Sequence, residues 1–324
     1  MPATDTSEKG LEGLIVASLT SAAGYAQGDP ADYDRDHAVD LAKFLAFLRA
    51  TQPRAFDQLG LDEDGPRRQQ FLAQLQGEIA KRGVVDVLRK GVKHGPAAVE
   101  LCYGTPTPGN QLAAERFAAN VFSVTRQLRY SKDERQLALD LALFINGLPV
   151  ATFELKNSLT KQTVEDAVEQ YQRDRDPREL LFQFGRCAVH FAVDDQEVRF
   201  CTELKGKESW FLPFNKGWND GAGNPPNPGG LKTDYLWRTI LAKPSLTNIL
   251  ENYAQIIEEA DAKGRKRQRQ IFPRYHQLDV VRKLLADAGA RRRPALPDPA
   301  LRRQRQEQLD RLARPPTGRA EAGR

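Results

Sequence analysis

The stretch DLALFINGLPVATFELK, residues 140–156, decides the fold of this chain. Two apolar runs, residues 137–145 and 150–155, flank a cluster of turn residues from Asn146 to Pro149. An Asn-Gly pair between apolar runs is a strong signal for a tight hairpin. The stretch therefore predicts two neighbouring antiparallel strands.

Three charged residues interrupt the apolar strands of this hairpin in a pattern that is typical of a metal-binding catalytic site. Glu154 and Lys156 lie two residues apart on the second strand, so both face the same side of the sheet. Burying them is costly unless they are paired or bind a cation. Asp140 on the first strand can converge on the same point, and two carboxylates with a backbone carbonyl suit Mg²⁺. A lysine alongside completes the equipment for metal-assisted phosphodiester hydrolysis. A cross-strand salt bridge of Lys156 with Glu154 or Asp140, on a half-exposed sheet, is the alternative interpretation.

Outside the hairpin, apolar periodicity alternates between helical and strand patterns, which predicts an α/β (α+β) fold with helices around a mixed sheet. Residues 210–230 are rich in Gly, Pro and Asn and predict a loop, and the basic run 263–269 predicts a solvated connector. Helices are predicted over 67–89 (broken at Gly83), 163–173, 236–257 and 277–288, a helix-loop-helix over 11–49, and further strands over 97–103, 120–130, 188–191 and 197–202.

Composition excludes several classes of protein. No apolar run approaches the roughly 20 residues of a membrane span, the N-terminus lacks a secretory pattern, and three scattered cysteines form no disulfide framework. We therefore expect a soluble, cytoplasmic protein. The net charge of +5 comes from residues 291–324, which hold ten Arg against four acidic residues. Residues 1–290 are nearly neutral, which argues against an RNA-binding module.

Longer stretches around the hairpin resemble a known family. LALDLALFINGLPVATFELKNSLTKQTVEDAVEQYQRDRDP (137–177), LEGLIVASLTSAAGY (11–25), YDRDHAVDLAKFLAFLRATQP (33–53) and QIFPRYHQLDVVRKLLADA (270–288) are similar to segments of type I restriction enzyme R (HsdR) subunits. The resemblance covers residues 10–290. It implies a PD-(D/E)xK nuclease core, followed in that family by an ATP-driven DNA translocase.

The resemblance also implies a domain organisation. Residues 1–205 would form the nuclease domain, 206–270 a linker and helical connector, and 271–290 the start of the motor domain. Residues 291–324 would be a disordered basic tail. The family's Walker A loop, G-S-G-K-S, does not occur in the sequence. Synonymous codons for Leu301–Ala320 can be chosen that read SAGSGKSNSIAWLAHQLAG in the next frame, so we expect the tail to be a frameshift product of a truncated R subunit.

Roles for individual residues follow from the resemblance. Asp140 and Glu154 would ligate Mg²⁺ together with the carbonyl of Leu155, and Lys156 would position the attacking water. Glu12 would act from outside the metal's ligand shell, the alternative being an ordinary exposed helix carboxylate.

Comparison with the family bears on three further residues. Gln277 would contact the adenine of ATP, which full-length members bind. Related nucleases place a Gln and a Tyr four residues apart after the ExK strand, whereas Gln170 and Tyr171 are adjacent here. We therefore predict that Tyr171 packs in the core rather than contacting DNA.

The implied activity is that of a type I site-specific deoxyribonuclease, cutting double-stranded DNA with Mg²⁺. Its partners would be the modification (M) and specificity (S) subunits, which read the sequence and methylation state. A catalytically silent fragment that only binds those subunits is the alternative.

Overall fold

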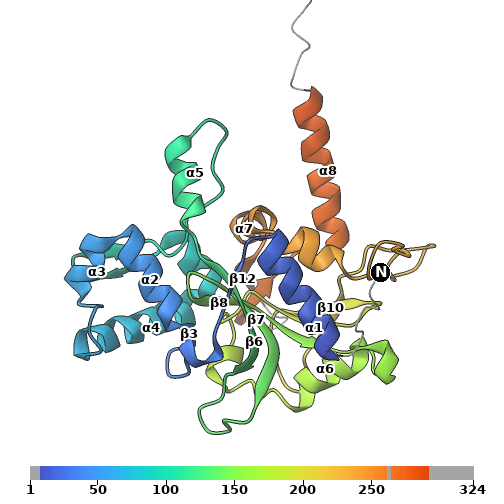
Figure 1. Cartoon of the computed structure of the whole chain (residues 1–324), viewed down its shortest axis with the longest axis horizontal. Helices are drawn as coiled ribbons and strands as arrows, with labels where there is room; N and C mark the ends of the chain where they lie inside the picture. Colours follow the sequence, from blue (N-terminus) through green and yellow to red (C-terminus); the bar gives the residue numbers. More distant parts are fainter. Residues whose placement is uncertain (1–7, 261–263, 292–324) are drawn as a thin grey trace, which may run out of the picture. The chain divides into compact units, whose positions relative to one another are not determined.

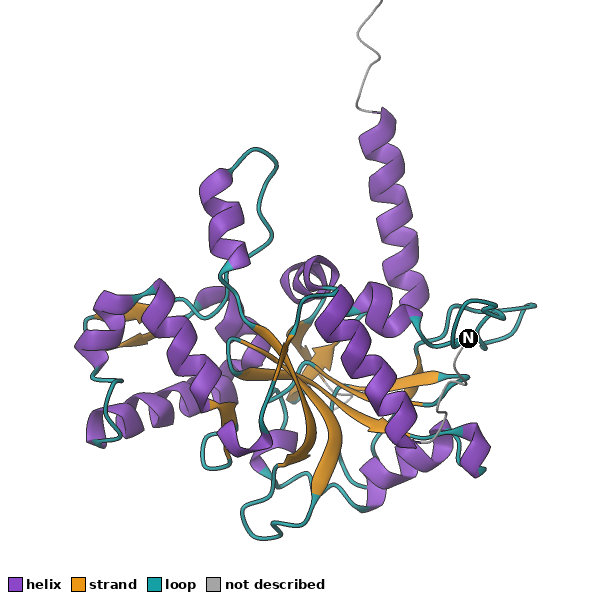
Figure 2. Ribbon diagram, in the orientation of Figure 1, coloured by secondary structure: helices purple, strands orange, loops and turns teal. Residues whose placement is uncertain are grey.

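The computed structural model describes residues 8–260 and 264–291. The chain divides into two compact units, residues 1–275 and residues 276–324. The first unit has the predicted mixed α/β architecture, with helices flanking a central sheet (Figures 1 and 2). Its helices are α1 (Glu8–Ala17), α2 (Leu41–Thr51), α3 (Pro53–Leu59), α4 (Pro66–Lys90), α5 (Gln111–Ala118), α6 (Val164–Arg173) and α7 (Lys243–Asn252), with π-helical turns at Ser18–Ala22 and Leu236–Ile240.

Within the described residues, seven strands form the central sheet in the order β1-β6-β7-β8-β9-β10-β11. The pairs β1–β6 and β8–β9 are parallel, and the other pairs are antiparallel. The strands are β1 (Ala26–Gln27), β6 (Phe122–Arg129), β7 (Ala138–Ile145), β8 (Leu148–Leu155), β9 (Val189–Val193), β10 (Val198–Cys201) and β11 (Leu212–Pro213). Separate two-stranded ribbons pair β2 (Tyr33–Asp34) with β3 (Val39–Asp40), and β4 (Val92–His94) with β5 (Ala97–Val99).

The β7–β8 hairpin confirms the central prediction. Asn146 and Gly147 form its two-residue loop, with φ angles of 51° and 81°. Positive φ at both positions is the conformation that an Asn-Gly hairpin turn adopts. The second strand begins two residues earlier than predicted, because Leu148 and Pro149 already pair with β7. Proline is tolerated there because it stands at the beginning of the strand, before β9 begins to pair at Ala151.

Replacing Gly147 with Ala should destabilise the protein by about 2–4 kcal/mol. A Cβ at this left-handed position would lie 2.4 Å from the carbonyl oxygen of Asp40 and 2.7 Å from the backbone nitrogen of Phe44. Urea denaturation measures the loss. Gly77→Ala, in open space on α4, is the control and should be neutral or slightly stabilising. A stability for Gly147→Ala within about 0.5 kcal/mol of wild type would contradict this packing.

Helix α6 packs against β8 and β9, next to the hairpin. A capping box formed by Thr163 and Asp166 starts the helix. Tyr171 is fully buried, as predicted, and its hydroxyl lies 2.8 Å from Oγ1 of Thr152 on β8. The Tyr171 contact therefore fixes the C-terminal part of the helix relative to the strand that carries Glu154.

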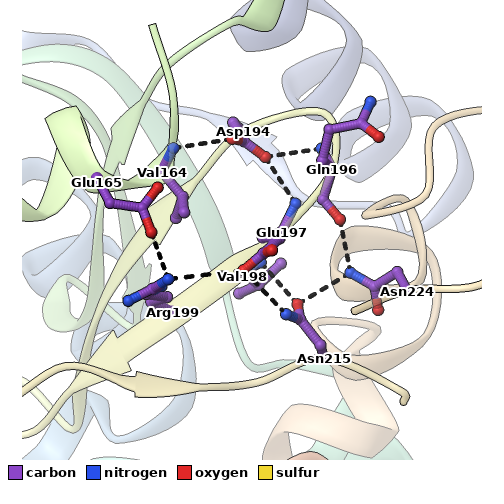
Figure 3. Close-up of polar contacts among 9 residues, drawn as sticks. All are labelled: Val164, Glu165, Asp194, Gln196, Glu197, Val198, Arg199, Asn215 and Asn224. Carbon is purple, nitrogen blue, oxygen red and sulfur yellow. Dashed lines mark hydrogen bonds and ion pairs between the residues drawn. The ribbon is translucent and has the colours of Figure 1, made fainter. Parts of the chain in front are cut away.

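A polar network fastens the predicted loop 210–230 to this end of the sheet (Figure 3). Asp194, at the turn between β9 and β10, accepts a 2.8 Å hydrogen bond from the backbone nitrogen of Val164 at the start of α6. Oδ1 of Asn215 accepts hydrogen bonds from the backbone nitrogen of Val198 and from Nδ2 of Asn224, both at 2.9 Å. Side-chain amides therefore hold a segment that has little regular structure of its own.

Two predictions on the C-terminal side of the loop are wrong. The helix predicted over 236–257 ends at Asn252, and the rest enters strand β12 (Gln255–Ala260). The basic run predicted as a connector contributes to β13 (Lys266–Ile271), which pairs with β12. Ion pairs of Lys266 with Glu258 (3.1 Å) and of Arg269 with Glu259 (3.5 Å) cross the ribbon. Opposite charges on facing strands stabilise this ribbon, a long-range effect that a local reading of the basic run misses.

The described part of the second unit is helical: α8 runs from Tyr275 to Arg291, which confirms the helix predicted over 277–288. Apart from Arg291, the predicted basic tail lies outside the described residues, and so does Lys263. The predicted boundaries at 205, 270 and 290 stay predictions.

Among the helices of the described residues, none has the length and apolar character needed to span a membrane.

Candidate active site

Glu154 is a fully buried acidic residue of the central sheet. It lies on β8, every residue of which is buried, and its own side chain is 0% exposed. Oε1 accepts a 2.6 Å hydrogen bond from Nε of Arg175, whereas Oε2 has no hydrogen-bond partner. Burial raises the pKa of Glu154 to about 8, although the charge of Arg175 opposes this change. A buried acceptor without a partner is costly and calls for a ligand.

Asp140 stands beside Glu154 on the neighbouring strand. Leu141 pairs with Phe153, so the next residues outward, Asp140 and Glu154, face each other across the antiparallel pair. Oδ2 of Asp140 accepts a 2.7 Å hydrogen bond from the backbone nitrogen of Leu155. The Asp140 carboxylate contributes to the raised pKa of Glu154. The structure therefore brings together the two predicted carboxylates and the backbone of Leu155.

Lys156 follows directly after β8 and is half-buried. Its backbone nitrogen donates a 2.8 Å hydrogen bond to the carbonyl oxygen of Val193 on β9, which extends the strand ladder by one residue. The Lys156 charge lies close enough to lower the pKa of Glu154. The alternative of a half-exposed sheet is wrong for Glu154, which is fully buried and has Arg175 as its hydrogen-bonded cation.

Arg175 is a site residue that the sequence analysis missed. It follows α6 by two residues, and its side chain is 4% exposed. Besides Glu154, its guanidinium donates to the carbonyl oxygen of Ala138 at 2.9 Å and to the hydroxyl of Tyr130 at 3.3 Å. The guanidinium also lies over the Tyr130 ring, 5.6 Å from its centroid. These contacts fix the Glu154 carboxylate through one oxygen and leave the other available.

A second buried polar group lies beneath the site. Oγ1 of Thr152, two residues before Glu154, is 2.7 Å from Nδ1 of His190 and 2.8 Å from the hydroxyl of Tyr171. Burial lowers the pKa of His190 to about 3. Near neutral pH the histidine is uncharged, so this group packs and hydrogen-bonds without adding charge to the site.

Glu12 on α1 belongs to the same region. It is 3% exposed, so it is not the exposed helix carboxylate of the alternative interpretation. Arg126 and Gln127 on β6 both donate to it, the latter from Nε2 to Oε2 at 2.9 Å. Nε2 of Gln127 also lies 3.5 Å from Oδ1 of Asp140. A cleft of about 380 Å³ is lined by Lys9, Glu12, Arg126, Gln127 and Asp140.

The two carboxylates suit a divalent cation that takes only a few of its ligands from the protein. In the described part of the chain, no three or more His, Cys, Asp or Glu side chains are grouped to hold a metal. Asp140 and Glu154, with the Leu155 carbonyl, would suit Mg²⁺, which keeps several water ligands. The unpartnered Oε2 of Glu154 supports this fit, because a cation there would satisfy the buried oxygen.

Gln277, predicted to contact adenine, lies exposed on α8 in the second unit. Its role with ATP stays a prediction.

Similarity to known proteins extends over the part of the chain that holds this site. Residues 5–209 match the model of the family described as type I restriction enzyme R protein N terminus. Two proteins of Methanocaldococcus jannaschii are similar. The type I restriction enzyme MjaVIIIP endonuclease subunit is 26% identical over 174 residues, covering 51% of this chain and 14% of that protein. The MjaIXP endonuclease subunit is 28% identical over 101 residues, covering 30% of this chain and 10% of that protein.

Proposed function

Since the chain belongs to the family of the type I restriction enzyme R protein N terminus, we propose that it is a Mg²⁺-dependent endonuclease that cleaves double-stranded DNA. Asp140, Glu154 and the carbonyl of Leu155 would hold the cation. The observation that carries the proposal is the fully buried Glu154, with one oxygen held by Arg175 and the other unpartnered beside Asp140. The similar archaeal proteins, named as endonuclease subunits, support the same activity.

The chain's own residues divide the work of the reaction. Arg175 holds Oε1 of Glu154 and so orients Oε2. Leu155 donates its backbone N–H to Asp140 and fixes that carboxylate. Lys156 would hold the attacking water or offset the negative charge that develops on the phosphate. When bound, Mg²⁺ would polarise the phosphate and make water more acidic. Glu12 would act from the cleft wall through Gln127 rather than as a ligand.

The partners in a restriction complex are part of the proposal. The matched regions take up 14% and 10% of the two similar proteins, so most of their length has no counterpart in these alignments. We propose that M and S subunits select the DNA, while this chain supplies cleavage. A silent fragment that only binds those subunits is the competing function.

The test is nicking of supercoiled plasmid by the purified chain with Mg²⁺, with and without M and S subunits, and with a chelator as the control. We expect nicking that depends on Mg²⁺ and increases when the subunits are present. Co-purification with the M and S subunits in the absence of any nicking would support the silent fragment instead.

Cation binding should depend steeply on pH. Because the pKa of Glu154 is raised to about 8, protons compete with the cation below that pH. The Mn²⁺ dissociation constant, measured by calorimetry, should increase about tenfold for each pH unit from about pH 8 down to about pH 6. The control is Glu154→Gln, whose weaker binding should lack this dependence. An unchanged dissociation constant for wild type over this range would contradict a ligand role for Glu154.

A further inference from the structure

Gln127 has a backbone conformation that its strand does not require. Its neighbours on β6 pair regularly with β7, Arg126 with Leu141 and Leu128 with Leu139. Gln127 itself has a φ of 46°, in the left-handed region that residues other than glycine rarely adopt. It stands beside Asp140, at the point where the ladder is interrupted.

The side chain of Gln127 connects the two acidic residues of the cleft. Its Nε2 donates to Oε2 of Glu12 at 2.9 Å and lies 3.5 Å from Oδ1 of Asp140. A primary amide nitrogen carries two hydrogens, so one group can serve two carboxylates. The second oxygen of Asp140 accepts from the backbone of Leu155. The Leu155 backbone therefore holds one oxygen of Asp140, and the Gln127 amide reaches the other.

Core packing does not explain this conformation. Gln127 is exposed and lines the cleft of about 380 Å³ together with Glu12 and Asp140. A glycine would adopt the same backbone angle freely. Residues other than glycine that are held in the left-handed region cluster at active sites and ligand-binding sites. The backbone turns the amide toward the carboxylates rather than into the core.

We propose that Gln127 is a positioning residue of the nuclease site, which sets the orientation of Asp140 and couples Glu12 to it. This inference rests on the proposed function, because Asp140 matters only as a ligand of the cation. Gln127 would act through its side-chain amide on the two carboxylates rather than as a ligand of the cation. The left-handed backbone is the means by which the strand delivers that amide.

The test replaces Gln127 with Gly, which keeps the backbone conformation and removes the amide. In the full chain, Mn²⁺ binding by calorimetry should weaken about tenfold, and the kcat of plasmid nicking should decrease by a similar factor with the KM for DNA unchanged. Gln127→Asn, which keeps a shorter amide and tolerates this backbone, should lie between Gly and wild type. The melting temperature of Gln127→Gly should equal or exceed that of wild type.

The matched control is Asn219→Gly, which relieves another exposed left-handed residue (φ 48°) in the 210–230 loop. It should leave Mn²⁺ binding and nicking unchanged. Mn²⁺ binding and kcat of Gln127→Gly within about twofold of wild type would overturn the positioning role while the nuclease function stands. Wild type that binds Mn²⁺ but does not nick would still support the role if Gln127→Gly weakens binding. Wild type that neither binds Mn²⁺ nor nicks would overturn the proposed function and this inference with it.

Discussion

Nicking of supercoiled plasmid is expected to slow by about 10²–10³-fold when Lys156 is replaced by Ala. The ammonium of Lys156 lies near enough to Glu154 to lower its pKa, and under the proposed function it would hold the attacking water or offset the charge that develops on the phosphate. Alanine keeps the backbone N–H that bonds Val193, so the β8–β9 ladder should remain intact. The measurement is the single-turnover rate with Mg²⁺ and excess protein.

The control for this variant is Lys161→Asn, which removes a positive charge from an exposed position five residues further on. Asparagine tolerates the positive φ of 60° at that position. Its nicking rate should stay within about twofold of wild type. Equal rates for Lys156→Ala and wild type would show that the lysine takes no part in the reaction.

The second large effect concerns stability. Arg175→Met should destabilise the protein by about 3–5 kcal/mol near about pH 10, because it leaves the buried, ionised Glu154 without its cation. The native pKa of Glu154, already raised, would increase further. Both proteins share the unfolded-state pKa of about 4.5, so the loss that arises from Glu154 begins only near the wild-type native pKa of about 8 and increases from there as the pH is raised. Urea denaturation at several pH values measures the effect.

Two further variants isolate the ion pair. The double variant Arg175→Met/Glu154→Gln should recover most of the lost stability near about pH 10, because no buried charge remains. Arg173→Met is the matched control, since Arg173 pairs with Glu169 on the exposed face of α6 and should change stability by less than about 0.5 kcal/mol. A loss in Arg175→Met that is equal at all pH values would contradict a penalty arising from Glu154.

Local sequence signals were sufficient to predict the part of the fold that positions the two carboxylates. Asn146 and Gly147 determine the hairpin because left-handed backbone at both positions suits few other residue pairs. Once the hairpin is known, the alternation along β8, extended by one residue to Lys156, predicts Glu154 and Lys156 on one face. Tyr171 was predicted to be buried, and it is.

Residues that complete the site depend on packing between distant segments and could not be predicted in the same way. A buried Glu154 requires a cation, but Arg173, Arg175 and Arg178 all follow within a few residues. Arg173 pairs with Glu169, and Arg178 pairs with Asp176. Arg175 reaches Glu154 because of how α6 packs on the sheet, which the sequence alone does not reveal. The left-handed backbone of Gln127 likewise has no local sequence signal. The β12–β13 ribbon was not predicted because the basic residues of β13 form ion pairs with acidic residues of β12, and this pairing is not visible in either segment alone.

The central claim is that Asp140 and Glu154 together hold a divalent cation, and Mn²⁺ binding to wild type and Asp140→Asn tests it without relying on catalysis. Asparagine can still accept the hydrogen bond from Leu155, so the variant should fold. We predict one bound Mn²⁺ per wild-type chain near pH 8 and binding at least about tenfold weaker in the variant. Equal binding by the two proteins would contradict the claim.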